Sequence, residues 1–157
     1  MSLTINNLYL LLFIFYFFLS SAFDLKNKSV PILVHIIFIL AGIPLFLYFN
    51  VFTHKAFGIN IIQNLALRFI PGMFLSTLSV LSRGALGIGD GIFVTVSGLF
   101  IPINYILSIV ISGFLSAFFA SVGILIYGKL RNRDLHRMSL PFIPFMLPGL
   151  YLILFNL

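Results

Sequence analysis

Two of the three acidic side chains in this chain lie at the edges of apolar segments. Asp90 lies in RGALGIGDGIFVTVSGLF, residues 83–100, where every other residue from Gly84 onward is apolar, glycine or a small hydroxyl. Asp24 follows another apolar run, in SSAFDLKNKSVP. A carboxylate inside an apolar layer costs about 2.5–3.5 kcal/mol on insertion scales unless it is paired or hydrated. The sequence therefore predicts a functional use for Asp90.

Two carboxylates that lie close together share one proton, so that one is ionised while the other is neutral. The ionised member activates a water molecule, and the neutral member protonates a leaving amine. This is the chemistry of aspartyl proteases, and it makes Asp24 and Asp90 candidate catalytic residues. Taken alone, Asp24 also fits an ordinary interfacial acid beside Lys26 and Lys28.

Other kinds of catalysis find less support in the residues present. The chain has no cysteine, which excludes a disulfide framework, a cysteine metal site and thiol chemistry. Serines in the apolar segments have no histidine or lysine at a clear partner spacing, and small hydroxyl residues are common where membrane helices pack. We therefore expect neither a metal ion nor another cofactor.

The composition is that of an integral membrane protein. Of 157 residues, 61% are hydrophobic and 8% are charged, whereas about 25% of residues are charged in soluble domains. The net charge of +6 is spread over short loops without an aromatic and basic face, which is typical of charges that orient a membrane protein. We therefore expect a lipid bilayer as partner and no nucleic acid.

Helices are the expected element, because lipid offers no hydrogen-bond partner to an open backbone. Each span needs about 20 mostly apolar residues. The uncharged stretch 91–128 is too long for one helix, and Pro102 in the IPIN turn divides it. The predicted spans are 3–23, 31–52, 61–81, the two parts of 91–128, and 139–156. The sequence predicts an all-α membrane protein, a polytopic bundle of about six transmembrane helices in a single domain, residues 1–157.

The first apolar run ends in LSSAF and also fits a cleaved secretory signal. The preceding MSLTINN carries no positive charge, and the lysines follow the run instead of preceding it. We therefore expect this run to be the first membrane helix.

The basic residues predict the orientation of the bundle. Alternate loops hold Lys26, Lys28, Arg83, Lys129, Arg131, Arg133 and Arg137. The opposite loops hold Lys55 alone, while Arg68 lies within the third span. Basic loops face the cytoplasm, so both termini should face outside and both Asp24 and Asp90 should lie at the cytoplasmic side. Roughly 18 Å of helix separates Asp90 from Pro102, which places Asp90 inside the hydrocarbon layer.

Three sequence elements resemble the prepilin peptidase family, also called type IV leader peptidases. GIGD at 87–90 is similar to the GxGD motif of membrane aspartyl proteases. DLKNKSVP follows the first span, and LPFIPFMLPGL begins the last with a PFxPF signature. The resemblance extends from Asp24 to Gly149 and implies six helices, with Asp24 and Asp90 as catalytic residues and Gly87 and Gly89 as motif glycines.

The resemblance also implies the substrate and the place of action. The family cleaves prepilin-like or pseudopilin proteins of type IV pili and secretion systems, at the cytoplasmic face of the cell membrane. Their short basic leader ends at a glycine, followed by an apolar helix. This chain has Gly91 and Ile92 where the family often has Val-Lys, and Pro31 and Ile32 where it often has Pro-Asn. Without the cysteine-containing insert of larger members, it resembles a short form with peptidase activity alone.

Two other functions remain open at this point. Paired acids also serve ion- or proton-coupled transporters, although the internal repeat typical of many transporters is not evident. A non-catalytic assembly relative of the peptidase is the other alternative. Among further polar residues, we expect His35 to be a structural histidine near the two acids, Arg68 to extend toward the outer headgroups, and Asp134 to pair with a neighbouring arginine in a solvated loop.

Overall fold

The structure, a computed structural model, describes residues 2–53, 59–82, 87–131 and 140–155, and every regular element in these ranges is helical. The elements in chain order are α1 (Ser2–Asn27), α2 (Ile32–Tyr48), the π-helical turn η1 (Phe49–Thr53), α3 (Ile59–Leu81), α4 (Ile88–Ser97), α5 (Ile103–Leu130), the 3₁₀ turn η2 (Ile143–Met146) and α6 (Leu147–Phe155). The prediction of an all-α bundle is thereby confirmed.

The helices differ in their capacity to cross a membrane. Four segments are long and apolar enough: Leu8–Asn27, Ile32–Val51, Ile59–Leu81 and Ile103–Leu130. The segments Ile88–Ser97 and Ile143–Phe155 are apolar but shorter. The described part of the chain therefore combines four helices long enough to span a membrane with two shorter ones.

The last helix begins later than the sequence predicted, at residue 143 instead of 139. Pro141 and Pro144 account for this delay, because a proline lacks the N–H that a helix ladder needs and restricts the residue before it. The segment starts as the 3₁₀ turn η2 and becomes α-helical only at Leu147. The short fourth helix agrees with the expected turn at Pro102, since α4 ends at Ser97.

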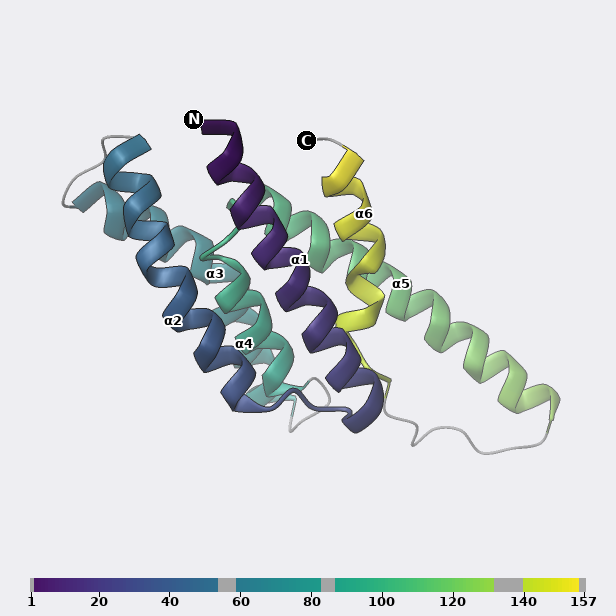
Figure 1. Cartoon of the computed structure of the whole chain (residues 1–157). Helices are drawn as coiled ribbons and strands as arrows, with labels where there is room; N and C mark the ends of the chain where they lie inside the picture. Colours follow the sequence, from purple (N-terminus) through teal and green to yellow (C-terminus); the bar gives the residue numbers. More distant parts are fainter. Residues whose placement is uncertain (1, 54–58, 83–86, 132–139, 156–157) are drawn as a thin grey trace.

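The helices are arranged so that the ends of the elements that carry Asp24 and Asp90 lie at the same end of the bundle. Figure 1 shows α4 behind α1 and α2, and both termini at one end of the molecule. The end of α1, the start of α2 and the start of α4 lie at the opposite end (Figure 1). α3 packs against α4 more extensively than any other pair of elements, and η2 contacts both α1 and α5.

An aromatic core joins the two helices that carry the aspartates. Tyr16 of α1 stacks on Phe93 of α4, with ring centroids 5.0 Å apart, and Phe17 meets the same ring edge-on at 5.7 Å. All three side chains are almost completely buried. Such pairs contribute about 0.5–1.5 kcal/mol each beyond the burial of their area. Asp24 lies two turns beyond Phe17, and Asp90 lies one turn before Phe93, so this core fixes their relative position.

Glycines allow α3 and α4 to approach closely. A Cβ added to Gly72 would lie 2.3 Å from the backbone nitrogen of Thr95, and one added to Gly91 would lie 2.6 Å from that of Ser76. Side chains at these positions would collide with backbone atoms, which explains why both positions hold glycine. Small residues are common where membrane helices pack closely. α3 thereby holds the short α4 inside the bundle.

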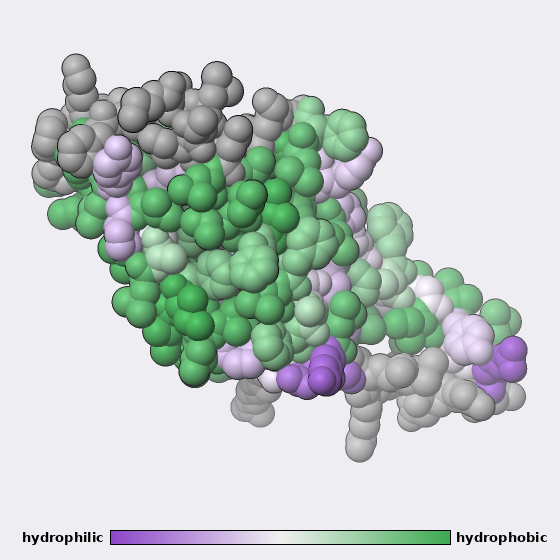
Figure 2. Space-filling model, viewed as in Figure 1, coloured by the Kyte–Doolittle hydropathy of each residue, from purple (hydrophilic) through white to green (hydrophobic). Residues whose placement is uncertain are grey.

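The outer surface agrees with a lipid environment. The face drawn in Figure 2 is mostly apolar, and the strongly hydrophilic residues gather where α1 and α5 end. The exposed residues at these two ends include Lys26, Asn27, Lys28, Lys129 and Arg131. The protein is therefore a membrane protein, and four of its described basic side chains lie at the ends of α1 and α5.

Candidate active site

A cavity of about 630 Å³ opens at the end of the bundle where α1 ends. Its walls come from the last turn of α1, the start of α2, the start of α4, the middle of α5 and the segment that leads into η2. Asp24, Asp90, Gly87 and Gly89 all line this cavity. The structure thus brings the four site residues predicted from the sequence to one place.

Asp24 is held by a backbone group from the far end of the chain. Its side chain is 5% exposed, and its Oδ2 accepts a hydrogen bond of 3.0 Å from the N–H of Ile143, 119 residues away. Ile143 is the first residue of η2, and N–H groups in the first turn of a helix have no partner within it. The start of η2 thus supplies a backbone N–H as donor to this carboxylate.

The end of α1 sets the height of Asp24 relative to α2. Lys28 adopts a left-handed conformation, with φ of 53°, and its N–H donates to the carbonyl oxygen of Asp24 at 2.8 Å. A residue in this conformation commonly ends a helix. Pro31 then precedes the first residue of α2 in an extended conformation. This tight connection keeps the end of α1 beside the start of α2.

Asp90 lies in the first turn of α4. Its N–H donates to the carbonyl oxygen of Gly87 at 3.1 Å, and Gly87 has the extended conformation of a residue that precedes a helix. An acid in the first turn is favoured by the helix dipole. The local sequence therefore forms a helix start that presents a carboxylate to the cavity.

The two motif glycines serve different purposes. A Cβ at Gly87 would lie 3.0 Å from Oδ2 of Asp90, so the missing side chain leaves room for that carboxylate. Around Gly89 no atom lies within 4 Å of an added Cβ, and this residue leaves the cavity open. Gly91, outside the motif, is the glycine that packs against α3.

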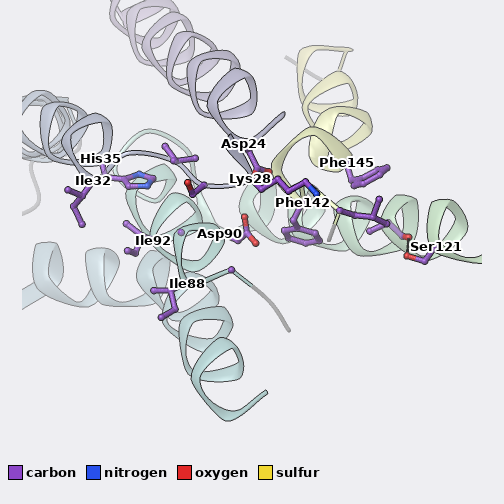
Figure 3. Close-up of a pocket in the computed structure, with 16 residues that line it drawn as sticks. Asp24, Lys28, Ile32, His35, Ile88, Asp90, Ile92, Ser121, Phe142 and Phe145 are labelled. Carbon is purple, nitrogen blue, oxygen red and sulfur yellow. Dashed lines mark hydrogen bonds between the residues drawn. The ribbon is translucent and has the colours of Figure 1, made fainter. Parts of the chain in front are cut away.

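The two carboxyl groups come from different walls of the cavity. In Figure 3, the Asp24 side chain lies at the end of α1, and the Asp90 side chain, from α4, lies below it. Both carboxyl groups border the same cavity. Two like charges that share one site oppose joint ionisation. The arrangement can therefore hold one ionised and one neutral carboxyl group beside a space large enough for water and a peptide.

The other polar residues have distinct environments. His35 lines the same cavity and shares a hydrogen bond of 2.7 Å between its Nδ1 and the hydroxyl of Tyr16. Arg68 lies apart from the cavity, where its Nε donates to Oδ1 of Asn64 at 2.9 Å and its guanidinium lies 5.3 Å from the ring centre of Phe46. Arg68 thus has partners within the helices.

The pairing predicted for Asp134 with a neighbouring arginine stays a prediction, because both residues lie outside the described residues. Within the described ranges no group of three or more His, Cys, Asp or Glu side chains is placed to hold a metal ion.

Two contributors to the site were not predicted from the sequence. The N–H of Ile143 carries no side-chain signal, although the flanking prolines mark a break where backbone donors become free. Tyr16 had a signal in its spacing: Tyr16, Ser20 and Asp24 follow at intervals of four residues, which places them on one face of a helix. All three are buried.

Comparison of the chain with protein-family models, with curated proteins and with solved structures finds no match. The resemblance to prepilin peptidases therefore rests on the three sequence elements at 24–31, 87–90 and 140–150.

Proposed function

We propose that this protein is an intramembrane aspartyl endopeptidase that removes the short basic leader of prepilin-like proteins at the cytoplasmic face of the membrane. The main support is that Asp24 and Asp90, from helices far apart in the sequence, line one cavity at the end of an apolar bundle. The order of the GIGD and PFIPF elements supports the choice of substrate.

The reaction uses both carboxyl groups. The ionised aspartate takes a proton from a water molecule as the water oxygen attacks the carbonyl carbon of the scissile peptide bond. The neutral aspartate gives its proton to the leaving nitrogen as the tetrahedral intermediate collapses and the C–N bond breaks. The products are a carboxyl group on the leader and a free amine on the mature protein.

The position of the cavity fits a substrate that is partly in the membrane. An apolar helix in the substrate partitions into the bilayer beside the apolar outer surface of this bundle. The junction between leader and helix then reaches the end of α1, where the cavity opens. Binding energy from the helix is thus used to bring the peptide bond to the carboxylates.

The direct test uses the purified protein in lipid vesicles with a synthetic peptide that has a basic leader, a glycine and an apolar helix. We expect a single cleavage after the glycine, identified by mass spectrometry, unchanged by EDTA and absent with Asp90→Asn. Aspartate-dependent ion flux across the vesicles without cleavage would instead support the transporter.

A cleavage that is lost in EDTA and restored by an added metal would contradict the two-aspartate mechanism. If the peptide stays intact under all conditions and no ion flux is found, the protease proposal also fails, and the non-catalytic relative is favoured.

A further inference from the structure

α5 is the least buried of the four helices that are long enough to span a membrane. Its first half packs inward through Ile106, Ile109 and Val110, which are buried. One side of it is covered by α6, since a Cβ added to Gly149 would lie 2.6 Å from the Cα of Ile109. In Figure 1, the helix continues past the other helices toward its C-terminal end. A large part of α5 is thus open to lipid or to another helix.

Four apolar side chains form an exposed line along one side of α5. They follow one another at intervals of four, three and four residues, which places them on one face of a helix. They are Leu107, Ile111, Phe114 and Phe118, each between 39% and 65% exposed. We call them the α5 stripe, and it extends over roughly 16 Å of helix.

The α5 stripe begins at the wall of the cavity that contains the two aspartates. Ala117, the neighbour of Phe118, lines this cavity. The ring of Phe114 lies 5.0 Å from the ring of Phe142, which lines the cavity as well. α4 starts at the cavity and leads away from it, and α5 returns to it in the middle of its length. The stripe therefore leads from the cavity toward the opposite end of the bundle.

The cavity is largely apolar where it meets α5. In Figure 3, Ser121 and Phe145 lie at this end, and the two aspartates lie nearer the middle. The residues that form the end are Ala117, Ser121, Phe142 and Phe145, and none of them is acidic. The Ser121 hydroxyl already donates to the carbonyl oxygen of Ala117 at 2.7 Å. This end of the cavity therefore suits an apolar segment of a bound peptide better than a basic leader.

We propose that the apolar helix of the substrate packs against the α5 stripe, so that its first residues enter the cavity at the α5 end and the scissile bond reaches the aspartates. This rests on the proposed peptidase function and adds a docking helix to it. Helices in lipid associate through close packing instead of the hydrophobic effect, and aromatic side chains offer a large area for such contacts. The substrate is favoured over lipid or a second copy because the stripe and the cavity are continuous and can receive consecutive parts of one peptide.

The absence of cysteine from the chain makes a disulfide test of this contact specific. Phe118→Cys places a thiol on the α5 stripe. Phe119→Cys is the matched control, because Phe119 is 64% exposed and Phe118 is 61% exposed, but the two point about 100° apart around the helix. The synthetic peptide carries one cysteine early in its apolar helix, and Asp90→Asn keeps it intact. After mild oxidation in vesicles, we expect a linked product with Phe118→Cys and far less with Phe119→Cys or with Leu40→Cys on α2.

A second thiol position tests the direction of the bound helix. Ile111 lies about two turns before Phe118 along α5, farther from the cavity. Helices that lie side by side rise equally per residue, so the peptide cysteine that links best to Ile111→Cys should lie about seven residues further into the apolar helix than the one that links best to Phe118→Cys. The reverse order, or equal linkage to Phe119→Cys, would overturn the proposal.

Cleavage kinetics test the same contact in the active protein. Phe118→Ala should raise KM about five-fold or more, as truncation of a well-packed interface residue commonly does, with kcat changed far less. Phe119→Ala should keep the wild-type KM. Both side chains are exposed, so neither substitution removes a buried contact of the core.

The outcomes separate this proposal from the peptidase itself. A disulfide between two copies of Phe118→Cys that excludes the peptide would assign the stripe to a second copy and overturn the proposal. If the wild type cleaves the peptide but neither linkage nor KM distinguishes Phe118 from Phe119, the docking surface is wrong while the peptidase stands. If the wild type does not cleave at all, the peptidase proposal has failed, and the docking surface fails with it.

Discussion

Arg68 and the Asp24–Asp90 pair are charged groups within apolar helices, but their surroundings differ. Arg68 is bonded to Asn64, one turn away on the same helix, and its guanidinium lies over the ring of Phe46. Asp24 receives its hydrogen bond from Ile143, at the opposite end of the chain. Asp90 lies on α4, a helix different from those of Arg68 and Asp24, and both acids border a cavity.

Arg68 has partners close by, whereas the fold brings the two acids together from separate helices. Arg68 has a hydrogen-bond partner one turn away on its own helix and an aromatic ring on a neighbouring helix. Its charge therefore needs no further role. Two like charges on separate helices at one cavity are a costly arrangement, and membrane-embedded charges of this kind commonly mark functional sites. We therefore expect substitutions in the two regions to affect different properties.

The largest effect is expected on cleavage by Asp24→Asn and Asp90→Asn. Asparagine keeps the shape of the side chain but removes the acid and base, and general acid–base groups contribute about 10²–10⁴-fold to rate. Asp134→Asn, the third acid of the chain, is the matched control and should retain cleavage. Rates measured on inserted protein in vesicles check this, and substantial cleavage by either purified variant of the pair would contradict it.

The next effect concerns stability and compares two glycines of one helix start. Gly91→Ala places a methyl group 2.6 Å from the backbone nitrogen of Ser76, and such overpacking costs about 1–3 kcal/mol. Gly89→Ala meets no atom within 4 Å, so the free energy of unfolding should stay unchanged or rise by about 0.5–1 kcal/mol. Thermal unfolding in detergent measures both.

The same pair of variants should separate stability from activity. The methyl group of Gly89→Ala lies at the wall of the cavity and should lower cleavage in a fully stable protein. Equal stability losses in Gly89→Ala and Gly91→Ala would show that α4 does not pack as described.

The smallest effect on cleavage is expected from Arg68→Met. Removing the cation from the ring of Phe46 should cost about 0.5–2 kcal/mol of stability and leave the cleavage rate per folded molecule unchanged. Methionine retains the apolar length of the side chain. A loss of cleavage comparable to that of Asp24→Asn, in a folded Arg68→Met protein, would remove the distinction between the two regions.

Local signals explain what could be predicted from the sequence. Hydropathy and the IPIN turn predicted the helices, including the short α4, because these depend on neighbouring residues. The alternation of the helices also brought Asp24 and Asp90 to the same end of the bundle. The roles of the glycines could not be assigned in the same way: Gly91 and Gly89 look alike in the sequence, and only the approach of Ser76 distinguishes them.

Contacts between distant segments account for the rest. The N–H of Ile143 reaches Asp24 across 119 residues, and a backbone donor leaves no trace in residue type. The start of the last helix was placed too early because hydropathy counts Pro141 and Phe142 as part of one apolar run, whereas the prolines delay the helix. The pairing of Tyr16 with His35 likewise requires the packing of α1 on α2.

The central claim is that Asp24 and Asp90 act as one catalytic unit, and the rate of the double variant Asp24→Asn/Asp90→Asn tests it most directly. Residues that act jointly in one step are not additive, because the loss of either already removes the mechanism. We predict that the double variant cleaves the synthetic peptide in vesicles no more slowly than the slower single variant. A double-variant rate reduced by the product of the two single effects would contradict the account, because it would show two independent contributions instead of one shared site.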